Sequence, residues 1–492
     1  MSGSMADDAL ALLPEGLLLA GAVGGLLAGL WTPRSRQIRV GVIAVLSCLA
    51  SAVTAAIRLS GPDQLVFEGT WVVDTSTGVV RIVVALGTAV AVVLCTSALA
   101  GHPRETEAYV LMLLGAVGAV ALAASGDLLL LVAAYLLASV PLYALAGFVK
   151  DARGVEASLK YYLMGAFVGV LMLVGVAALI LATGSSGYPD LAAGLPGASA
   201  PLVAVGVLGV LAGMAFKAGA VPVHFWVPDV TAGTTPPIAA YITTIPKVGG
   251  VAAAFRLLAE PFAQVPLDVP LLVAVVAAVS MTLGNLAAFA QREVLRLLAY
   301  STVSQVGYLL MVVAVAARTD LATEALAVYL AGYAVTNLGA FAAAAALPGR
   351  TISEWAEAAR HRPWLVLSLV VCLLGLVGTP PTAVFVGKLA VFAAAADGAL
   401  AWLVVLAAVN TVASLFYYLR WVAPAAAAVG AGVGAGAGVG AGAGAEVGAG
   451  VQDASGRTGT VDRIAETVLH ATAAATLLLG IGAGAWLTFV AA

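Results

Sequence analysis

The sequence carries very little charge for its length. Only 10% of its 492 residues are Asp, Glu, Lys or Arg, whereas 62% are apolar. An average soluble domain has about 25% charged residues, so this chain has too few to cover a water-facing surface. The composition therefore predicts a polytopic membrane protein. The sequence also has no stripe of basic residues, so nothing in it points to nucleic-acid binding.

The sequence is also poor in residues that bind metals or redox groups. Its three cysteines, Cys48, Cys95 and Cys372, all lie inside apolar runs, and no CxxC or Cys/His cluster is present. This pattern argues against a disulfide framework, a metal site or an iron–sulfur site. There is no Gly-rich nucleotide loop or flavin motif either, so we expect no cofactor on this chain. The acidic start, "MSGSMADDALALLPEG", lacks the basic region of a cleavable signal peptide, which predicts a retained first helix.

Long apolar runs dominate the rest of the sequence. Because a spanning helix needs about 20 apolar residues, we predict an all-α membrane protein with about fourteen transmembrane helices. The predicted spans are 9–30, 37–59, 78–100, 107–124, 127–149, 158–183, 201–222, 236–259, 267–290, 294–317, 321–347, 363–396, 398–423 and 465–491. Proline lacks a backbone donor and clashes with the preceding turn, so Pro222 should break the seventh helix and Pro380–Pro381 the twelfth. The Gly/Ala-rich tract 424–452 is predicted to be a flexible cytoplasmic linker.

The distribution of basic residues predicts the orientation of these spans. Of the 22 Lys and Arg residues, fifteen fall on one side of the predicted bundle, in segments that follow odd-numbered spans. The opposite side has four: Arg58, Arg81, Arg256 and Arg318. The positive-inside rule makes the richer side cytoplasmic and places both termini on the non-cytoplasmic side. Three lysines belong to neither side: Lys217, Lys247 and Lys388.

These three lysines are the candidate functional residues. A mid-span amine lies more than about ten ångströms from the interface at about 1.5 Å rise per residue, which is beyond the reach of a lysine side chain. A charged lysine at the bilayer centre costs at least about 2.5–3.5 kcal/mol, so we expect these amines to face a protein interior or a hydrated cavity. The alternative is that they snorkel to the headgroups.

Burial disfavours the charged form of an amine, so a buried lysine can exchange protons near neutral pH, as an arginine cannot. A row of such amines predicts a proton path. His224 follows Lys217 by seven residues and should share its helix face. We interpret it as a proton relay, or alternatively as a hydrogen-bonded interior histidine.

The chain also shows a weak internal symmetry. Two sets of five helices open near residues 107 and 267, and in each set the fourth helix has a proline break and a lysine. Interrupted helices in corresponding positions are typical of inverted-repeat transporters. We therefore divide the chain into a three-helix segment, a first repeat, a second repeat, a linker and a final helix. Their predicted ranges are 1–104, 105–260, 261–423, 424–463 and 464–492.

Six stretches resemble one known family. They are "SLKYYLMGAF" (158–167), "FKAGAVPVHFWVPDV" (216–230), "TTIPKVGG" (243–250), "LLAYSTVSQVGY" (297–308), "GTPPTAVFVGKLAVF" (378–392) and "FYYLRW" (416–421). They resemble the antiporter-like membrane subunits of respiratory complex I. The Pro246–Lys247 pair, "VPDV" and "YYLR" are most similar to the N-type members of that family. The resemblance covers residues 105–423 and implies fourteen helices in two inverted five-helix repeats. It also implies that Lys217, Lys247 and Lys388 occupy the positions of the family's channel lysines.

The resemblance implies a proton-translocating subunit of NADH-quinone oxidoreductase in the bacterial plasma membrane. NADH, FMN, iron–sulfur clusters and quinone would then be bound by other subunits. The implied partners are the K-, L-, M-, J-, A- and H-type membrane subunits, the peripheral arm and the lipid bilayer, with no nucleic acid. An alternative is a subunit of a multisubunit sodium/proton antiporter, which shares "STVSQVGY"-like sequence, although Pro246–Lys247 argues against it.

Two positions depart from the family pattern. Leu136 stands where the family has a glutamate that pairs with the lysine of helix seven, and Gln305 stands where it has a histidine. Tyr135 and Ser139 are the nearest polar residues to the missing carboxylate, and neither carries a negative charge at pH 7. These departures suggest a divergent second copy. They leave a further alternative open, a non-pumping structural copy.

Overall fold

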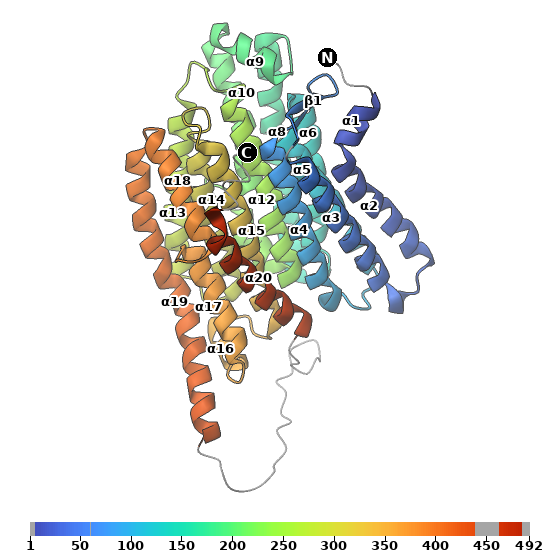
Figure 1. Cartoon of the computed structure of the whole chain (residues 1–492), viewed down its shortest axis with the longest axis vertical. Coiled ribbons are helices and arrows are strands. Elements are labelled where there is room, and N and C mark those ends of the chain that lie inside the picture. The colour runs from blue at the N-terminus through green and yellow to red at the C-terminus, as the bar shows by residue number, and fades with distance from the viewer. Residues whose placement is uncertain (1–4, 60, 438–461, 485–492) are drawn as a thin grey trace.

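The computed structural model describes residues 5–59, 61–437 and 462–484, and it is almost entirely helical (Figure 1). Its one sheet is a short antiparallel hairpin of β1 (Gln64–Val66) and β2 (Trp71–Val73). Two 3₁₀ turns cover Arg34–Arg36 and Leu195–Gly197. The α-helices are α1 (Met5–Ala11), α2 (Leu13–Trp31), α3 (Ile38–Arg58), α4 (Thr75–Ala98), α5 (Glu105–Ala124), α6 (Leu128–Leu137), α7 (Val140–Ala146), α8 (Ala152–Thr183), α9 (Tyr188–Gly194), α10 (Ala200–Ala218), α11 (Trp226–Gly233), α12 (Pro236–Ala259), α13 (Val269–Phe289), α14 (Val294–Val313), α15 (Ala322–Ala346), α16 (Ile352–Ala358), α17 (Pro363–Val377), α18 (Ala383–Asp397), α19 (Ala401–Ala437) and α20 (Arg463–Ile481).

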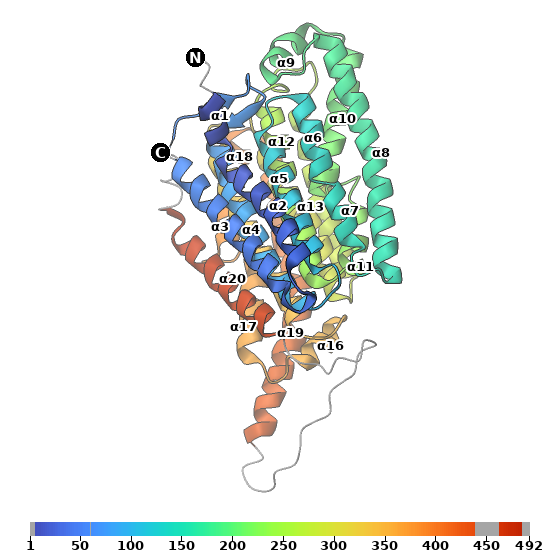
Figure 2. The same cartoon turned by 90° about the vertical axis from the view of Figure 1, so that its right-hand side faces the viewer.

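The all-α membrane fold predicted from the sequence is confirmed. Within the described residues, thirteen helices are long and apolar enough to cross a membrane. The shorter helices α17 and α18 follow each other along the predicted twelfth span (Figures 1 and 2). The long helices run roughly parallel to one another in one bundle (Figure 2).

The two predicted breaks are present. Helix α10 ends at Ala218, where Gly219 adopts a left-handed conformation (φ +75°) that only glycine takes readily. Helix α17 ends at Val377, and Gly378 (φ +89°) closes it in the same way. Because α10 stops before Pro222, His224 lies in the connection to α11. The prediction that Lys217 and His224 share a helix face is therefore wrong.

A third break, in the fifth predicted span, was not anticipated. Helix α6 ends at Leu137 and α7 begins at Val140. The Leu142 N–H donates to the Ser139 carbonyl at 3.0 Å, so it is diverted from Ala138, its usual α-helical acceptor. The break therefore leaves the Ala138 carbonyl available to another donor.

Helix α19 is longer than predicted. It continues through Pro424 to Ala437 and extends past the other helices in Figure 1. Four consecutive alanines, residues 425–428, follow this proline, and alanine has the highest helix propensity. The prediction of a flexible linker is therefore wrong for residues 424–437. The part of the tract from 438 to 461 lies outside the described residues.

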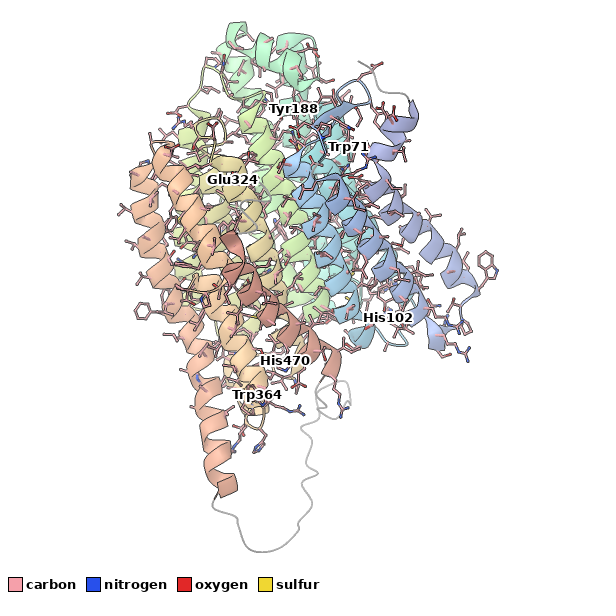
Figure 3. All side chains as sticks on the ribbon, in the orientation of Figure 1. Trp71, His102, Tyr188, Glu324, Trp364 and His470 are labelled. Carbon is pink, nitrogen blue, oxygen red and sulfur yellow. The ribbon has the colours of Figure 1, made fainter. Side chains whose placement is uncertain are left out.

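Helix α12 forms the centre of the bundle. Every residue from Pro237 to Leu258 is buried, and α12 packs against α4, α5, α10, α14 and α15. The bundle has two ends, which Figure 3 distinguishes. Trp71, Tyr188 and Glu324 lie toward one end, which we call the outer end; His102, Trp364 and His470 lie toward the other, the inner end.

Candidate functional site: three buried lysines

All three lysines singled out in the sequence point into the protein. Lys217, Lys247 and Lys388 are 1%, 0% and 3% exposed. They lie on α10, α12 and α18, so the row crosses from one predicted repeat to the other. This burial excludes the alternative in which their amines snorkel to the headgroups.

The Lys217 amine binds the break between α6 and α7. Its Nζ donates to the Ala138 carbonyl at 3.0 Å and to Ser139 Oγ at 2.5 Å. Ser139 Oγ in turn donates to the Tyr135 carbonyl at 2.6 Å, and the Tyr135 ring centre lies 4.9 Å from Nζ. Lys217 is therefore held by two neutral oxygens and an aromatic face.

The position of the missing family carboxylate does not face Lys217. Leu136 is 51% exposed and points out of the bundle. Two carboxylates nearby in sequence are also engaged elsewhere. Asp151 caps α8 by accepting from the Gly154 N–H, and Glu156 pairs with Lys160 at 2.8 Å. The side chains that contact the Lys217 amine are thus those of Tyr135 and Ser139, the two polar residues that the sequence had indicated.

Lys247 lies halfway along the enclosed helix α12. Its Nζ donates to Thr302 Oγ1 on α14 at 2.8 Å, and the Trp226 ring centre lies 5.9 Å away. The amine also lies beside the end of α10, because a Cβ placed on Gly219 would be 3.1 Å from it. Lys247 therefore links the first broken helix to the second set of helices.

Lys388 lies just beyond the second broken helix. Its Nζ donates to the Val377 carbonyl, the last of α17, at 2.9 Å and to Thr411 Oγ1 at 3.3 Å. The final carbonyls of a helix have no partner within the helix, so the break supplies this acceptor. The Tyr308 ring centre lies 3.9 Å from the amine, and the Thr411 hydroxyl donates to the Tyr308 hydroxyl.

Helix α14 carries polar side chains that contact both the central lysine, through Thr302, and the second break, through Gln305. Gln305 Nε2 donates to the Leu376 carbonyl at 2.7 Å, beside the carbonyl that binds Lys388. Its Oε1 accepts from the Tyr329 hydroxyl at 2.6 Å. Gln305, which stands where the family has a histidine, thus fixes the end of α17 by hydrogen bonds but carries no titratable group.

His224 is 5% exposed and its ring packs against Phe225. Its Nδ1 has no hydrogen-bond partner among the described residues. The sequence had suggested that His224 shares a helix face with Lys217, but α10 ends at Ala218. The structure therefore places His224 in the connection between α10 and α11, with a buried ring nitrogen that has no partner within the ranges that the structure describes.

Within the described residues, no Asp or Glu forms an ion pair with any of the three lysines. Two buried arginines, by contrast, do have carboxylate partners. Glu15 on α2 pairs with Arg81 on α4 at 2.6 Å, and Asp74 pairs with Arg256 at 2.8 Å. Sequence reasoning had placed both arginines on the outer side and missed these pairs. For Glu15 and Arg81, a carboxylate and an arginine inside neighbouring apolar helices were the available signal.

The cysteines and potential metal ligands are dispersed in the described part of the chain. Cys48, Cys95 and Cys372 are free and buried. No group of three or more His, Cys, Asp or Glu residues there could hold a metal ion. The three buried amines, held by neutral oxygens, can exchange protons.

Comparisons with known proteins identify the family of the chain. The family model described as "NADH:quinone oxidoreductase/Mrp antiporter, TM" matches residues 125–414. NADH-quinone oxidoreductase subunit N 1 of Streptomyces griseus is 51% identical over 484 residues, which cover 98% of each chain. Subunit N 2 of the same organism is 38% identical over 440 residues, 85% of this chain and 82% of that one. The chain is thus more similar to the first of these two copies.

A solved structure shares the fold over nearly the whole chain. A chain of respiratory complex I from Thermus thermophilus with bound aureothin superimposes with a TM-score of 0.76 and 30% identity. The superposition covers 96% of this chain and 98% of that chain.

Proposed function

Because the chain belongs to the NADH:quinone oxidoreductase/Mrp antiporter family of membrane proteins, we propose that it translocates protons as a membrane subunit of NADH-quinone oxidoreductase. One observation carries the proposal: three buried amines on α10, α12 and α18 have neutral hydrogen-bond partners. An amine that a carboxylate does not hold in the charged form can release its proton and take one up again.

Protons pass between the three lysines in the order Lys217, Lys247 and Lys388, from one helix to the next. Lys217 and Lys388 each bind a carbonyl that a helix break exposes, and Lys247 lies between them against Thr302. His224, in the connection that follows the α10 break, serves as a further proton-transfer residue. The two sets of five helices, residues 105–260 and 261–423, act as two half-channels that meet at α12.

The chain is a multi-pass membrane protein, and its partners are other subunits of the same complex. We place it in the bacterial plasma membrane with both termini outside, because the basic residues gather at the inner end. Its neighbours there are the K-, L-, M-, J-, A- and H-type membrane subunits. NADH, FMN, the iron–sulfur clusters and quinone are bound by other subunits.

Replacement of one lysine tests the proposal. Lys388→Ala in the assembled complex should stop proton uptake into inverted vesicles, while the detached peripheral arm still oxidises NADH. Lys150→Ala is the matched control, because Lys150 is exposed at the inner end of the bundle. Normal pumping by Lys388→Ala would refute the proposal.

The same vesicles address the sodium/proton alternative and the non-pumping copy. Proton uptake that needs NADH but no sodium would exclude the antiporter reading. A proton-to-electron ratio that is the same with the wild-type chain and with Lys388→Ala would favour the non-pumping copy, which the missing carboxylate at Leu136 had suggested.

A further inference from the structure

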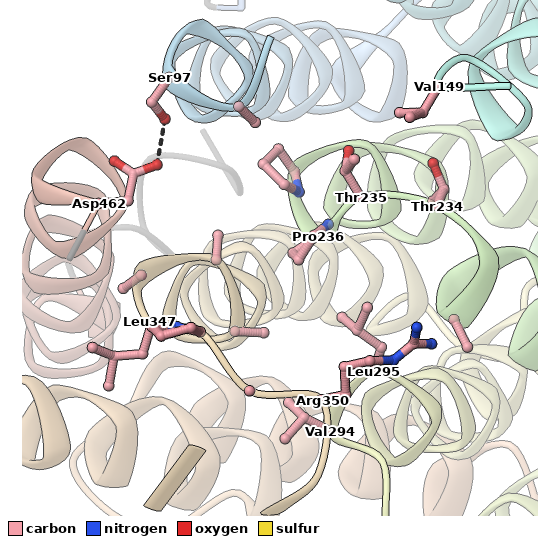
Figure 4. A pocket seen from close by; sticks show the side chains of 18 of the residues that line it. Ser97, Val149, Thr234, Thr235, Pro236, Val294, Leu295, Leu347, Arg350 and Asp462 are labelled. Carbon is pink, nitrogen blue, oxygen red and sulfur yellow. Dashed lines mark hydrogen bonds between the residues drawn. The ribbon is translucent and has the colours of Figure 1, made fainter. Parts of the chain in front are cut away.

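A pocket opens at the inner end, where three parts of the chain meet. Its volume is about 870 Å³. Ser97 comes from the end of α4, Thr234 and Thr235 from the α11–α12 connection, and Leu295 from the start of α14 (Figure 4). The pocket therefore borders the N-terminal segment and both predicted repeats, and the first residues of α12 line it.

Three mutually packed helices lead from this pocket toward Lys247. Helices α4 and α15 end at the pocket and α12 begins there. Thr88 lies ten residues before the end of α4, Asn337 nine before the end of α15, and Thr244 eight after the start of α12. At about 1.5 Å rise per residue, all three lie about 12–15 Å along their helices from the pocket. Lys247 is three residues further along α12.

These three residues lie in one layer of the bundle. A Cβ placed on Gly87 would be 2.5 Å from Ile245 Cδ1 and 3.5 Å from Leu338 Cδ1. Gly87, Ile245 and Leu338 are each next in sequence to one of the three polar residues. Asn337 Nδ2 also donates directly to Thr244 Oγ1 at 2.8 Å.

Two polar atoms in this layer are unpaired. Thr88 Oγ1 and Asn337 Oδ1 belong to fully buried residues and have no hydrogen-bond partner among the described residues. Other buried helical threonines bond back to their own helix: Thr231 donates to the Val227 carbonyl and Thr243 to the Ala239 carbonyl. Buried polar atoms without partners are rare and need an explanation such as bound water.

The pocket also has buried polar atoms without partners among the residues described. The Thr234 and Thr235 hydroxyls are buried and have no partner in the part of the chain that the structure describes. Unpaired polar atoms therefore lie both at the pocket and in the layer about 12–15 Å further along the helices. The charged residues of the rim balance one another, because three acidic and three basic side chains line it: Asp151, Glu293, Asp462, Arg153, Arg350 and Arg463.

We propose that Thr88, Thr244 and Asn337 bind water and form a proton inlet that runs from this pocket directly to Lys247, without passing through Lys217. Each water in the chain accepts one proton on the pocket side and passes one on. The Lys247 nitrogen finally forms the new N–H bond and becomes an ammonium. The inlet rests on the proposed function, since it supplies protons to one of its three amines.

Two variants of Thr88 test the inlet: Thr88→Val removes the hydroxyl, and Thr88→Ser keeps it. Valine has nearly the shape of threonine and the Thr88 hydroxyl has no protein partner among the described residues, so Thr88→Val should still assemble, and the detached peripheral arm should still oxidise NADH. Thr88→Val should nevertheless lower the proton-to-electron ratio in vesicles, whereas Thr88→Ser should retain the wild-type ratio. Thr96→Val is the matched control on the same helix, because the Thr96 hydroxyl is already bonded to the Val93 carbonyl.

Asn337→Leu carries the same prediction from a second helix and serves if Thr88→Val fails to assemble. Wild-type ratios in both variants would overturn the inlet. Lys388→Ala separates this failure from failure of the proposed function. If Lys388→Ala stops pumping while Thr88→Val and Asn337→Leu do not, the lysine row stands and the inlet alone is wrong. If Lys388→Ala also pumps normally, both are wrong.

Discussion

The broken helices that carry Lys217 and Lys388 both provide the buried amine with a carbonyl acceptor, but they do so in different ways. Lys217 lies just before the break on α10 and binds a carbonyl from a different broken helix, between α6 and α7. Lys388 lies just after the break on α18 and binds the last carbonyl of α17, from the same interrupted span. In both places a broken helix exposes a carbonyl, a hydroxyl adds a second oxygen and a tyrosine ring lies close by.

The surroundings of the two lysines differ in one important respect. Gln305 on α14 donates to the Leu376 carbonyl, which is next to the Val377 carbonyl that accepts from Lys388. Lys388 is thereby joined to α14. Lys217 touches the central helix mainly by packing, with its Cγ against Gly250. The difference teaches that the polar connection is better developed between the central lysine and the second repeat. Four variants test this comparison.

The largest effect should come from the point where the two halves meet. Lys247→Ala removes the amine that both halves share, and loss of a positioned proton-transfer group typically slows a reaction about 10²-fold or more. We expect proton uptake by vesicles to be lost, while the peripheral arm still reduces artificial acceptors. A substantial remaining uptake would mean that protons pass between the halves without Lys247.

Lys217→Ala should have a smaller effect than Lys388→Ala. The inlet delivers protons to Lys247 directly, so loss of Lys217 should reduce the proton-to-electron ratio without abolishing it. The two variants are compared in the same vesicle preparation at equal NADH oxidation rates. Equal losses would show that the first repeat is as necessary as the second.

Ser139→Asp should weaken only the first repeat. The new carboxylate would lie at the position of a hydroxyl that is 2.5 Å from Lys217 Nζ, and an opposite charge at that distance favours the ammonium form. We expect a loss of proton uptake no larger than that of Lys217→Ala. Ser139→Thr keeps the hydroxyl and is the control. A higher ratio in Ser139→Asp than in wild type would contradict this account.

The smallest effect is expected at Leu136. Its side chain points out of the bundle, so Leu136→Glu should not form an ion pair with Lys217. The proton-to-electron ratio of Leu136→Glu and of its uncharged control Leu136→Gln should match wild type. A rise in Leu136→Glu alone would show that an outward carboxylate still governs the first repeat.

Much of the fold could be predicted from the sequence because hydrocarbon is a simple solvent. Apolar runs of the right length indicated the spans. Pro222 and Pro380–Pro381 indicated the breaks because a proline removes a backbone donor, although Pro246 and Pro424 stand inside helices that continue. The burial of three lysines followed from their distance to the interface. These inferences need only local sequence and the thickness of the bilayer.

The contacts of the site could not be predicted in the same way. Pro141 signals a weak point in the fifth span, but only the structure shows that the break exposes Ala138 to Lys217. A helical face was assumed for His224, although Gly219 ends the helix five residues earlier. The unpaired atoms of Thr88 and Asn337 depend on how three helices pack, and such tertiary contacts leave no periodic signal in the sequence.

A fixed charge at the centre of α12 tests most directly whether the buried amines carry protons. Arginine stays protonated in proteins, so Lys247→Arg keeps the positive charge but cannot release it. The measurement is the proton-to-electron ratio of Lys247→Arg beside Lys247→Ala in the same vesicles. We predict that arginine restores no pumping. A wild-type ratio in Lys247→Arg would show that a permanent charge suffices, and it would contradict proton transfer through Lys247.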